Sequence, residues 1–469
     1  MPRARGAKKA ERPGKRGKAR HALYLVLFAG LLVGLLSFQP DRGSAWLYSF
    51  LSWGELLSNG LIALVLLALH LQHRQPALLG ERRSLAFLGG LLLVIMMLDK
   101  VANLFSPYLT PVAFVIGLAV IFIGTEVGLL LAVALAFLIG LGRGFYPVES
   151  LVALGGGLAM LLGTREIRRG GDLALAMAGI GVALINMLIL LATSISISFA
   201  SPKWNAVGWA GANGLISYLL ILGGIPLSEY LTDKTSPLGL MELLSPSHPL
   251  MERLQGEAPG TYHHSRAIAQ LGANAARAIG ADPLLTEVGG YYHDIGKLDN
   301  PGYFAENQEG GENPHDELSP PMSKLILASH VRKGVELGRR YGLRKDVHRF
   351  IPEHHGTSVI RYFYVKALQE HRYEQILIDD YRYEAERPRT KETAIIMLAD
   401  SVEAAVRAAE SERLEEIIDE QFRAKLDDGQ LDESPLSIAD LHKIKQAFYE
   451  TLRAMRHGRP EDYPRPSET

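Results

Sequence analysis

The C-terminal half of the chain places histidine and aspartate side chains at five positions, three of which are adjacent pairs. They are His263–His264, His293–Asp294, His330, His354–His355 and Asp400. A lone histidine on an apolar helix face is usually a satisfied core residue, but five such sites on successive helices favour a shared metal centre. The chain has 469 residues and no cysteine, so disulfides are excluded and any metal must be held by His, Asp or Glu.

The pair His293–Asp294 indicates two metal ions. Two metals about 4 Å apart need a bridging ligand. A carboxylate has two oxygens and can bridge, whereas a neutral imidazole has one free lone pair and cannot. We therefore expect His293 to serve one metal and Asp294 to bridge both, so that a water between them is acidified and directed at phosphorus. Lys297 would either neutralise charge building on a phosphoryl oxygen or be a solvated charge at a helix end.

The segments that carry these residues have the pattern of amphipathic helices. Apolar residues recur at spacings of three and four in residues 264–280, 323–342 and 391–411. His330 lies within one such helix, and His354–His355 are expected to begin another. No stretch alternates convincingly enough for a strand, so the predicted fold class is all-α.

The N-terminal half contains eight apolar stretches that could span a membrane. They are residues 22–39, 48–72, 84–105, 109–124, 126–142, 148–163, 173–198 and 206–228. A helix needs about 20 apolar residues to cross a bilayer. The fourth to sixth stretches are short and rich in glycine, so counts of six or seven spans stay open. We predict a polytopic helical transmembrane domain embedded in the lipid bilayer.

Basic residues predict the orientation of these spans. Arg and Lys concentrate in cytoplasmic loops, and here they gather in the N-terminal tail and in residues 73–83 and 164–172. Eight spans then place both termini in the cytoplasm of a protein of the inner or plasma membrane. The tail could also contact lipid headgroups. The net charge of −1 argues against a nucleic-acid polymer as partner.

Composition divides the chain into five parts. We expect a basic cytoplasmic tail (1–21), a transmembrane domain (22–229), a linker (230–244), a helical cytoplasmic domain (245–457) and a C-terminal tail (458–469). The cytoplasmic domain carries every candidate metal ligand, so the chemistry is expected outside the membrane. A homo-oligomer is compatible with this organisation, but nothing in the sequence specifies one.

The sequence around the candidate ligands resembles the HD superfamily of metal-dependent phosphohydrolases, and more narrowly the seven-transmembrane-HD family of bacterial cyclic di-AMP phosphodiesterases. The shared segments are GTYHHS (260–265), YYHDIGK (291–297), ENQ (306–308), NPHD (313–316), SHV (329–331), EHHGT (353–357), YFY (362–364) and TKETAIIMLADSVEAA (390–405). An HD pair alone is weak evidence for this superfamily, whereas this ordered set of segments is highly specific for the family. The resemblance extends into the membrane half from the second span onward.

The resemblance implies that residues 245–457 form an HD phosphohydrolase domain with seven metal ligands. One metal would be held by His264, His293 and Asp400, the other by His330, His354 and His355, with Asp294 bridging the two. The metals would be two divalent transition-metal ions, manganese or iron. Asp294 and Lys297 would act in catalysis. The implied reaction is hydrolysis of the cyclic dinucleotide cyclic di-AMP to the linear dinucleotide, in second-messenger turnover.

Base selection must come from the walls of the pocket, because a metal pair attacks many phosphodiesters. Asn313, Thr357, Tyr362 and Tyr364 are the candidate substrate-binding residues, with the tyrosine rings offering faces on which a purine can stack. The alternative for the two tyrosines is ordinary core packing.

One feature departs from the family pattern. A large extracellular domain usually follows the first span in the family, whereas about eight residues (40–47) stand there in this chain. Sensing through that domain is therefore in doubt, but every ligand position is kept. The alternatives are an HD hydrolase of another nucleotide (cyclic di-GMP or an alarmone) and a catalytically idle membrane receptor that only binds a dinucleotide. The GYP signature of cyclic di-GMP enzymes is missing.

Overall fold

The structure, a computed structural model, describes the chain from Gly80 to Arg456, together with Gln72 and Leu78. Within that range the description excepts residues 143–146, 199–202, 309–312, 371–375 and 410–412. The first expected span, nearly all of the second and both expected tails lie outside the described residues. The chain divides into two compact units, Met1–Ser236 and Pro237–Thr469, here called the membrane unit and the C-terminal unit.

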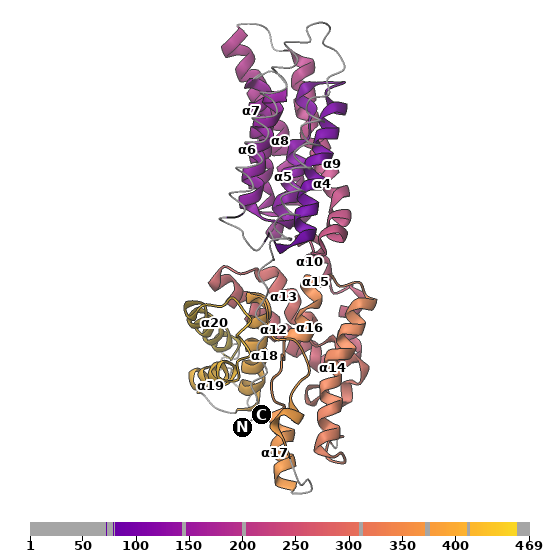
Figure 1. The fold of residues 1–469 in the computed structure, drawn as a ribbon, viewed down its shortest axis with the longest axis vertical. Helices are drawn as coiled ribbons and strands as arrows, with labels where there is room; N and C mark the ends of the chain where they lie inside the picture. The colour runs from indigo at the N-terminus through magenta and orange to yellow at the C-terminus, as the bar shows by residue number, and fades with distance from the viewer. Residues whose placement is uncertain are drawn as a thin grey trace, which may run out of the picture. The chain divides into compact units, whose positions relative to one another are not determined.

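The described part of the membrane unit is a bundle of apolar helices (Figure 1). Its elements are α4 (Arg82–Ala102), the 3-10 turn η1 (Pro107–Leu109), α5 (Val112–Phe122), α6 (Thr125–Gly142), α7 (Pro147–Thr164), α8 (Ile167–Ser198) and α9 (Trp204–Thr232). These helices match expected spans three to eight. By length and composition, α4, α7, α9 and Gly171–Ile195 of α8 can cross a membrane, whereas the stretches at α5 and α6 are shorter.

Helix α8 shows why this unit belongs in a bilayer. Leu173, Met177 and Leu184 recur along one face of the helix and are 70%, 64% and 61% exposed. Leu175 and Val182, on other faces, are fully buried against neighbouring helices. An exposed apolar stripe of this kind is unfavourable in water and favourable against lipid tails. The protein is therefore a membrane protein.

Two boundaries differ from the sequence-based expectation. Helix α8 begins at Ile167, inside the expected loop 164–172, and is interrupted at Gly171, whose φ of 54° suits a residue without Cβ. The C-terminal unit begins at Pro237, inside the expected linker, because α10 packs with it. Tyr292 donates a hydrogen bond of 2.7 Å to the carbonyl of Leu243 at the end of α10.

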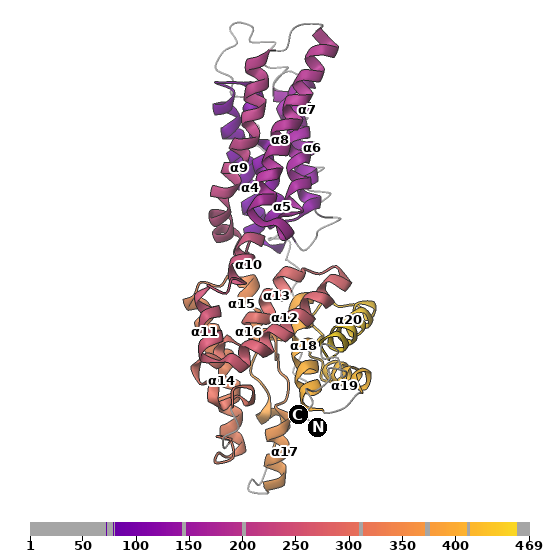
Figure 2. The same cartoon turned by 180° about the vertical axis from the view of Figure 1, so that it is seen from behind.

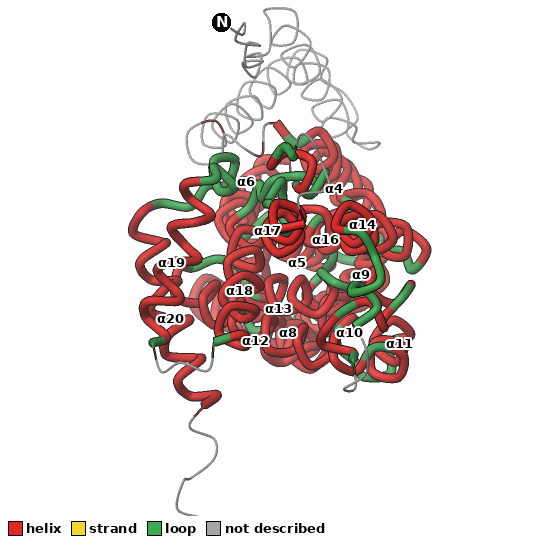
Figure 3. The backbone as a smooth tube through the Cα atoms, turned by 90° about the horizontal axis from the view of Figure 1, so that it is seen from below, coloured by secondary structure: helices red, strands yellow, loops and turns green. Residues whose placement is uncertain are grey.

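The C-terminal unit is helical throughout its described residues (Figures 2 and 3). Its elements are α10 (Pro237–Leu243), α11 (Pro249–Glu257), α12 (Pro259–Ile279), α13 (Pro283–Tyr292), η2 (Ile295–Asp299), η3 (Pro301–Tyr303), η4 (Ala305–Asn307), α14 (Pro320–Arg340), α15 (Lys345–His348), α16 (Phe350–Glu353), α17 (Arg361–Glu370), η5 (Ile378–Tyr381), α18 (Lys391–Ala408), α19 (Leu414–Asp427) and α20 (Ile438–Arg456). The described backbone has no strand, only an isolated bridge between Val359 and Arg382. The all-α prediction is confirmed.

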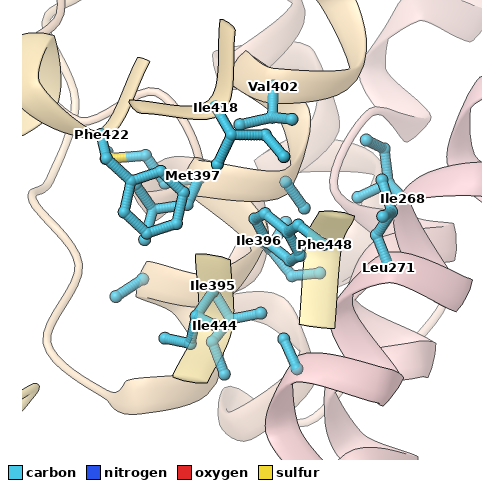
Figure 4. Close-up of a cluster of buried hydrophobic side chains, with 14 of the residues drawn as sticks. Ile268, Leu271, Ile395, Ile396, Met397, Val402, Ile418, Phe422, Ile444 and Phe448 are labelled. Atoms are coloured by element: carbon cyan, nitrogen blue, oxygen red, sulfur yellow. The ribbon is translucent and has the colours of Figure 1, made fainter. Parts of the chain in front are cut away.

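The largest apolar core of this unit surrounds α18. Side chains from α12, α19 and α20 pack on it, and the rings of Phe422 and Phe448 meet edge to face at 5.9 Å (Figure 4). Residues 394–399 of α18 are all fully buried. A helix held on several sides in this way is a rigid support for the side chain that follows its buried stretch, Asp400.

Candidate metal centre

The structure brings all seven predicted ligands into one cluster. His264 lies in α12, His293 and Asp294 lie between α13 and η2, His330 lies in α14, His354 and His355 follow α16, and Asp400 lies in α18. The ligand atoms of all of them except Asp400 form two close groups. Asp294 with His330, His354 and His355 makes one, and His264, His293 and Asp294 make the other. The neighbouring His263 is exposed.

Asp294 lies between the two histidine groups with one oxygen toward each. Its Oδ2 is 3.2 Å from His293 Nε2 and 3.6 Å from His264 Nε2. Its Oδ1 is 3.3 Å from His330 Nε2 and 3.4 Å from His354 Nε2. This is the arrangement required of a carboxylate that bridges two cations.

Asp400 contacts both groups. Its Oδ1 is 3.2 Å from His264 Nε2, and its Oδ2 is 3.5 Å from His355 Nδ1. The family resemblance assigns Asp400 to the metal of His264 and His293. The geometry leaves its second oxygen facing the other group.

Backbone carbonyls orient three of the imidazoles. The Nδ1 atoms of His293, His330 and His354 each donate to the carbonyl three residues earlier in the chain, at 2.7, 2.6 and 2.7 Å. A carbonyl can only accept, so the proton is on Nδ1 and Nε2 keeps its lone pair for a metal. His264 uses a side chain instead: its Nδ1 is 2.8 Å from Glu403 Oε2.

Buried polar atoms without partners test whether a cation fits. His293 Nε2 and Asp294 Oδ1 are both inaccessible and make no hydrogen bond, although ion-pair contacts of 3.2 to 3.4 Å surround them. Unsatisfied buried groups are rare and costly, so two within one cluster indicate that a ligand satisfies them. The donor set, neutral nitrogens and carboxylate oxygens, suits a divalent cation. The residues present therefore fit metal binding.

Protonation states largely agree with this fit. Burial lowers the pKa of His330 to about 4 and that of His355 well below its ordinary value, so both rings are neutral at pH 7. His264 differs. Burial lowers its pKa, but Asp400 and Glu403 more than offset this and raise it to about 9. A cation at His264 must therefore displace a proton.

Lys297 forms a buried ion-pair network with two carboxylates. Its Nζ is 2.7 Å from Asp294 Oδ2 and 2.5 Å from Glu306 Oε1, and its side chain is only 12% exposed. Burial lowers the pKa of Lys297, but the two carboxylates raise it above its ordinary range, so it remains charged. Burial alone would raise the pKa of Asp294, but Lys297 and His293 outweigh it and hold that pKa well below its ordinary value. The solvated reading of Lys297 is wrong.

The expectation that His354–His355 begin a helix is also wrong. They follow the last turn of α16, and Gly356 has a φ of 55°, which ends the helical path. Ser358 then donates its backbone N–H to the carbonyl of His355, closing a turn. The two imidazoles therefore leave the backbone where it bends.

The four candidate substrate residues are mostly engaged elsewhere. Asn313 Oδ1 accepts from the backbone of His315, and Thr357 shares hydrogen bonds with Gln430. Tyr362 is 65% exposed. Tyr364 packs on Tyr381 at 5.8 Å, as the core-packing alternative anticipated.

A different aromatic residue reaches the cluster. The ring of Tyr383 stacks on His355 at 4.1 Å and 20°, and its pKa is raised by burial. Together with Glu306 and Glu403, it was missed by the sequence reasoning. Glu306 and Glu403 both had a usable signal, since they lie in the shared segments 306–308 and 390–405, and Glu403 also follows Asp400 by three positions and so shares its helix face.

Comparison with known proteins finds a matching family model for each unit. Residues 50–236 match the family model described as 7TM receptor with intracellular HD hydrolase, and residues 261–405 match the HD domain. The chain is similar to the 7TM-HD family in both units. An HD domain implies divalent metal binding, and the His/Asp cluster lies inside the matched range.

Two curated relatives are also similar to this chain in sequence. The cyclic-di-AMP phosphodiesterase PgpH of Bacillus subtilis is 40% identical over 292 residues, which are 61% of this chain and 41% of that protein. PgpH of Listeria monocytogenes is 39% identical over 298 residues, 62% of this chain and 41% of that protein. The chain thus spans about two fifths of these curated relatives.

A solved structure matches the C-terminal part. It is the HD domain of L. monocytogenes PgpH in complex with cyclic-di-AMP, 41% identical, covering 45% of this chain and 99% of that chain with a TM-score of 0.43.

Proposed function

We propose that the protein is a membrane-bound, metal-dependent phosphodiesterase that hydrolyses cyclic di-AMP to the linear dinucleotide. The observation that carries the proposal is Asp294, with one oxygen toward each of two histidine groups. The names of the two PgpH relatives support the choice of substrate. The proposed occupants are two divalent ions, manganese or iron, with the ligand sets implied by the family.

The residues around the centre divide the work of binding and positioning. Bound metal would supply Lewis acidity and acidify water beside phosphorus. Carbonyl-anchored imidazoles point their Nε2 atoms inward with little freedom to rotate. Lys297 fixes Asp294 Oδ2 and brings a permanent positive charge next to the site where phosphoryl charge builds. Tyr383 covers one face of His355 and so helps to hold that ring in place.

Side-by-side kinetics on two cyclic dinucleotides test the substrate. With the full-length protein in detergent and manganese, kcat/KM for cyclic di-AMP should exceed that for cyclic di-GMP by roughly tenfold or more, because a pocket that pairs with one base edge leaves its polar groups unpaired against another. The linear diadenylate should be the first product. Equal values, or a preference for the guanine ligand, would overturn the substrate while leaving the reaction class standing.

The competing readings separate in the same assay. An alarmone hydrolase would turn over neither cyclic dinucleotide. An idle receptor would bind one of them without product, at full metal loading.

Orientation in the membrane is a further part of the proposal, and reporter fusions test it. We expect cytoplasmic signals from fusions at Arg20 and at Thr469, because the Arg-rich segments 73–83 and 164–172 favour the cytoplasm. A fusion at Lys203, between α8 and α9, should give the opposite signal. A non-cytoplasmic signal at Thr469 would refute the eight-span arrangement.

A further inference from the structure

Lys425 of α19 is a partly buried cation near the metal centre that the proposed mechanism does not use. Its Nζ donates a hydrogen bond of 2.8 Å to Ser358 Oγ, and Ser358 is only 8% exposed. Ser358 closes the turn that carries His355, since its backbone N–H donates to the His355 carbonyl at 3.1 Å. Lys425 is therefore one hydrogen bond away from the turn that presents a metal ligand.

The carboxylates near Lys425 are committed to other partners. Asp428 forms a two-pronged ion pair with Arg382, at 3.0 and 2.9 Å, and also accepts from Gln430 at 2.8 Å. Asp400 faces His264 and His355. Among the described residues, no carboxylate oxygen lies within 4.0 Å of the Lys425 ammonium. Of its three donors, one reaches a neutral hydroxyl.

A cation in such a place is costly for the folded protein. Burial lowers the pKa of Lys425, and the more distant charges of Asp400 and Asp428 only partly offset it. A desolvated ammonium without a close counter-ion is unfavourable, and groups of this kind concentrate at functional sites. Lys297 at the same centre provides the contrast, because two carboxylates neutralise it at 2.7 and 2.5 Å.

We propose that Lys425, with the hydroxyl of Ser358, binds a non-bridging phosphate oxygen of the substrate. An ammonium and a hydroxyl side by side are the donors that a phosphodiester anion accepts. The inference rests on the proposed function. It adds a phosphate-binding residue, from a helix that carries none of the metal ligands, to a reaction otherwise assigned to those ligands and Lys297.

Full-length Lys425→Met, Lys425→Arg and wild-type protein, each in detergent with manganese, test the inference. For Lys425→Met we expect KM for cyclic di-AMP to rise about 10- to 100-fold, the loss of one charge-assisted hydrogen bond. Lys425→Arg should recover part of it. The melting temperature of Lys425→Met should stay equal or rise, because an apolar side chain replaces an uncompensated cation. Bis(p-nitrophenyl) phosphate has a single phosphodiester and therefore shows which phosphate of cyclic di-AMP Lys425 binds. If Lys425 binds the phosphate under attack, Lys425→Met also raises the KM for this substrate. If Lys425 binds the second phosphate, that KM stays unchanged.

Lys445→Met is the matched control. Lys445 lies on α20 in an exposed ion pair with Asp419, so its removal should leave KM unchanged. The inference is overturned if Lys425→Met keeps the wild-type KM for cyclic di-AMP, or if it melts earlier with kcat and KM disturbed together and no recovery by arginine, as a purely structural lysine would. A wild-type protein that hydrolyses no cyclic dinucleotide would overturn the proposed function as well, so the two failures are distinguishable.

Discussion

Asp294→Ala should abolish both metal binding and hydrolysis. The substitution removes the carboxylate that belongs to both close groups of ligand atoms, and it leaves the Lys297 ammonium with a single carboxylate partner. Loss of metal removes several kcal/mol of transition-state stabilisation, so kcat/KM should fall by about a thousandfold or more. Metal analysis of the purified protein should show about two ions per chain in the wild type and a loss of the pair in the variant.

Asp299→Ala is the control for this experiment. Asp299 ends the same 3-10 turn, but it is exposed and only 3.5 Å from Lys333 in a surface pair, so metal content and turnover should be retained. Wild-type turnover in Asp294→Ala would refute the two-metal reading.

Gly296→Ala should damage the same centre from the backbone side. A Cβ on Gly296 would lie 1.8 Å from the carbonyl oxygen of His330 and 2.5 Å from the backbone nitrogen of Gly334, so η2 and α14 must separate. Overpacking of this kind costs about 1–3 kcal/mol of stability or more. Because His330 moves with α14, we expect kcat/KM to fall by about a hundredfold. Thermal unfolding and kinetics of the full-length protein measure both effects.

Gly302→Ala gives the comparison, because a Cβ there meets nothing within 4 Å. That variant should match the wild type in melting temperature and turnover. If Gly296→Ala also had the melting temperature and turnover of the wild type, η2 and α14 could not lie as close together as described.

The helical fold could be predicted because periodicity reports burial along a single helix. Residues 391–411 show this well, since α18 covers Lys391–Ala408 and buries the apolar positions that the pattern selects. Periodicity says less where a helix stops. Helix α16 ends at Glu353, and the positive φ at Gly356 keeps the chain from continuing as a helix, which is a local effect. Helix α10 joins the C-terminal unit through the hydrogen bond of Tyr292, which is a tertiary effect.

The clustering of the candidate ligands could be predicted because imidazole and carboxylate groups in such an order have few other uses. Their supporting residues could not. Glu306 and Glu403 lie in segments shared with the family, but only the fold shows that they pair with Lys297 and His264. Tyr383 was missed because a tyrosine in an irregular segment carries no periodic signal. Tyr362 was chosen for its ring, yet it faces solvent.

The carbonyl bonds that hold the imidazoles have a mechanical consequence. Each of His293, His330 and His354 is tied to a carbonyl of its own turn, three residues back. A ring anchored in this way cannot swing toward a metal independently, so each ligand moves as one rigid piece with its helix end. Any displacement of α14 against α13 would therefore change the spacing of ligand atoms directly. A signal could therefore regulate this centre by shifting the helices, and no side chain would have to change its rotamer.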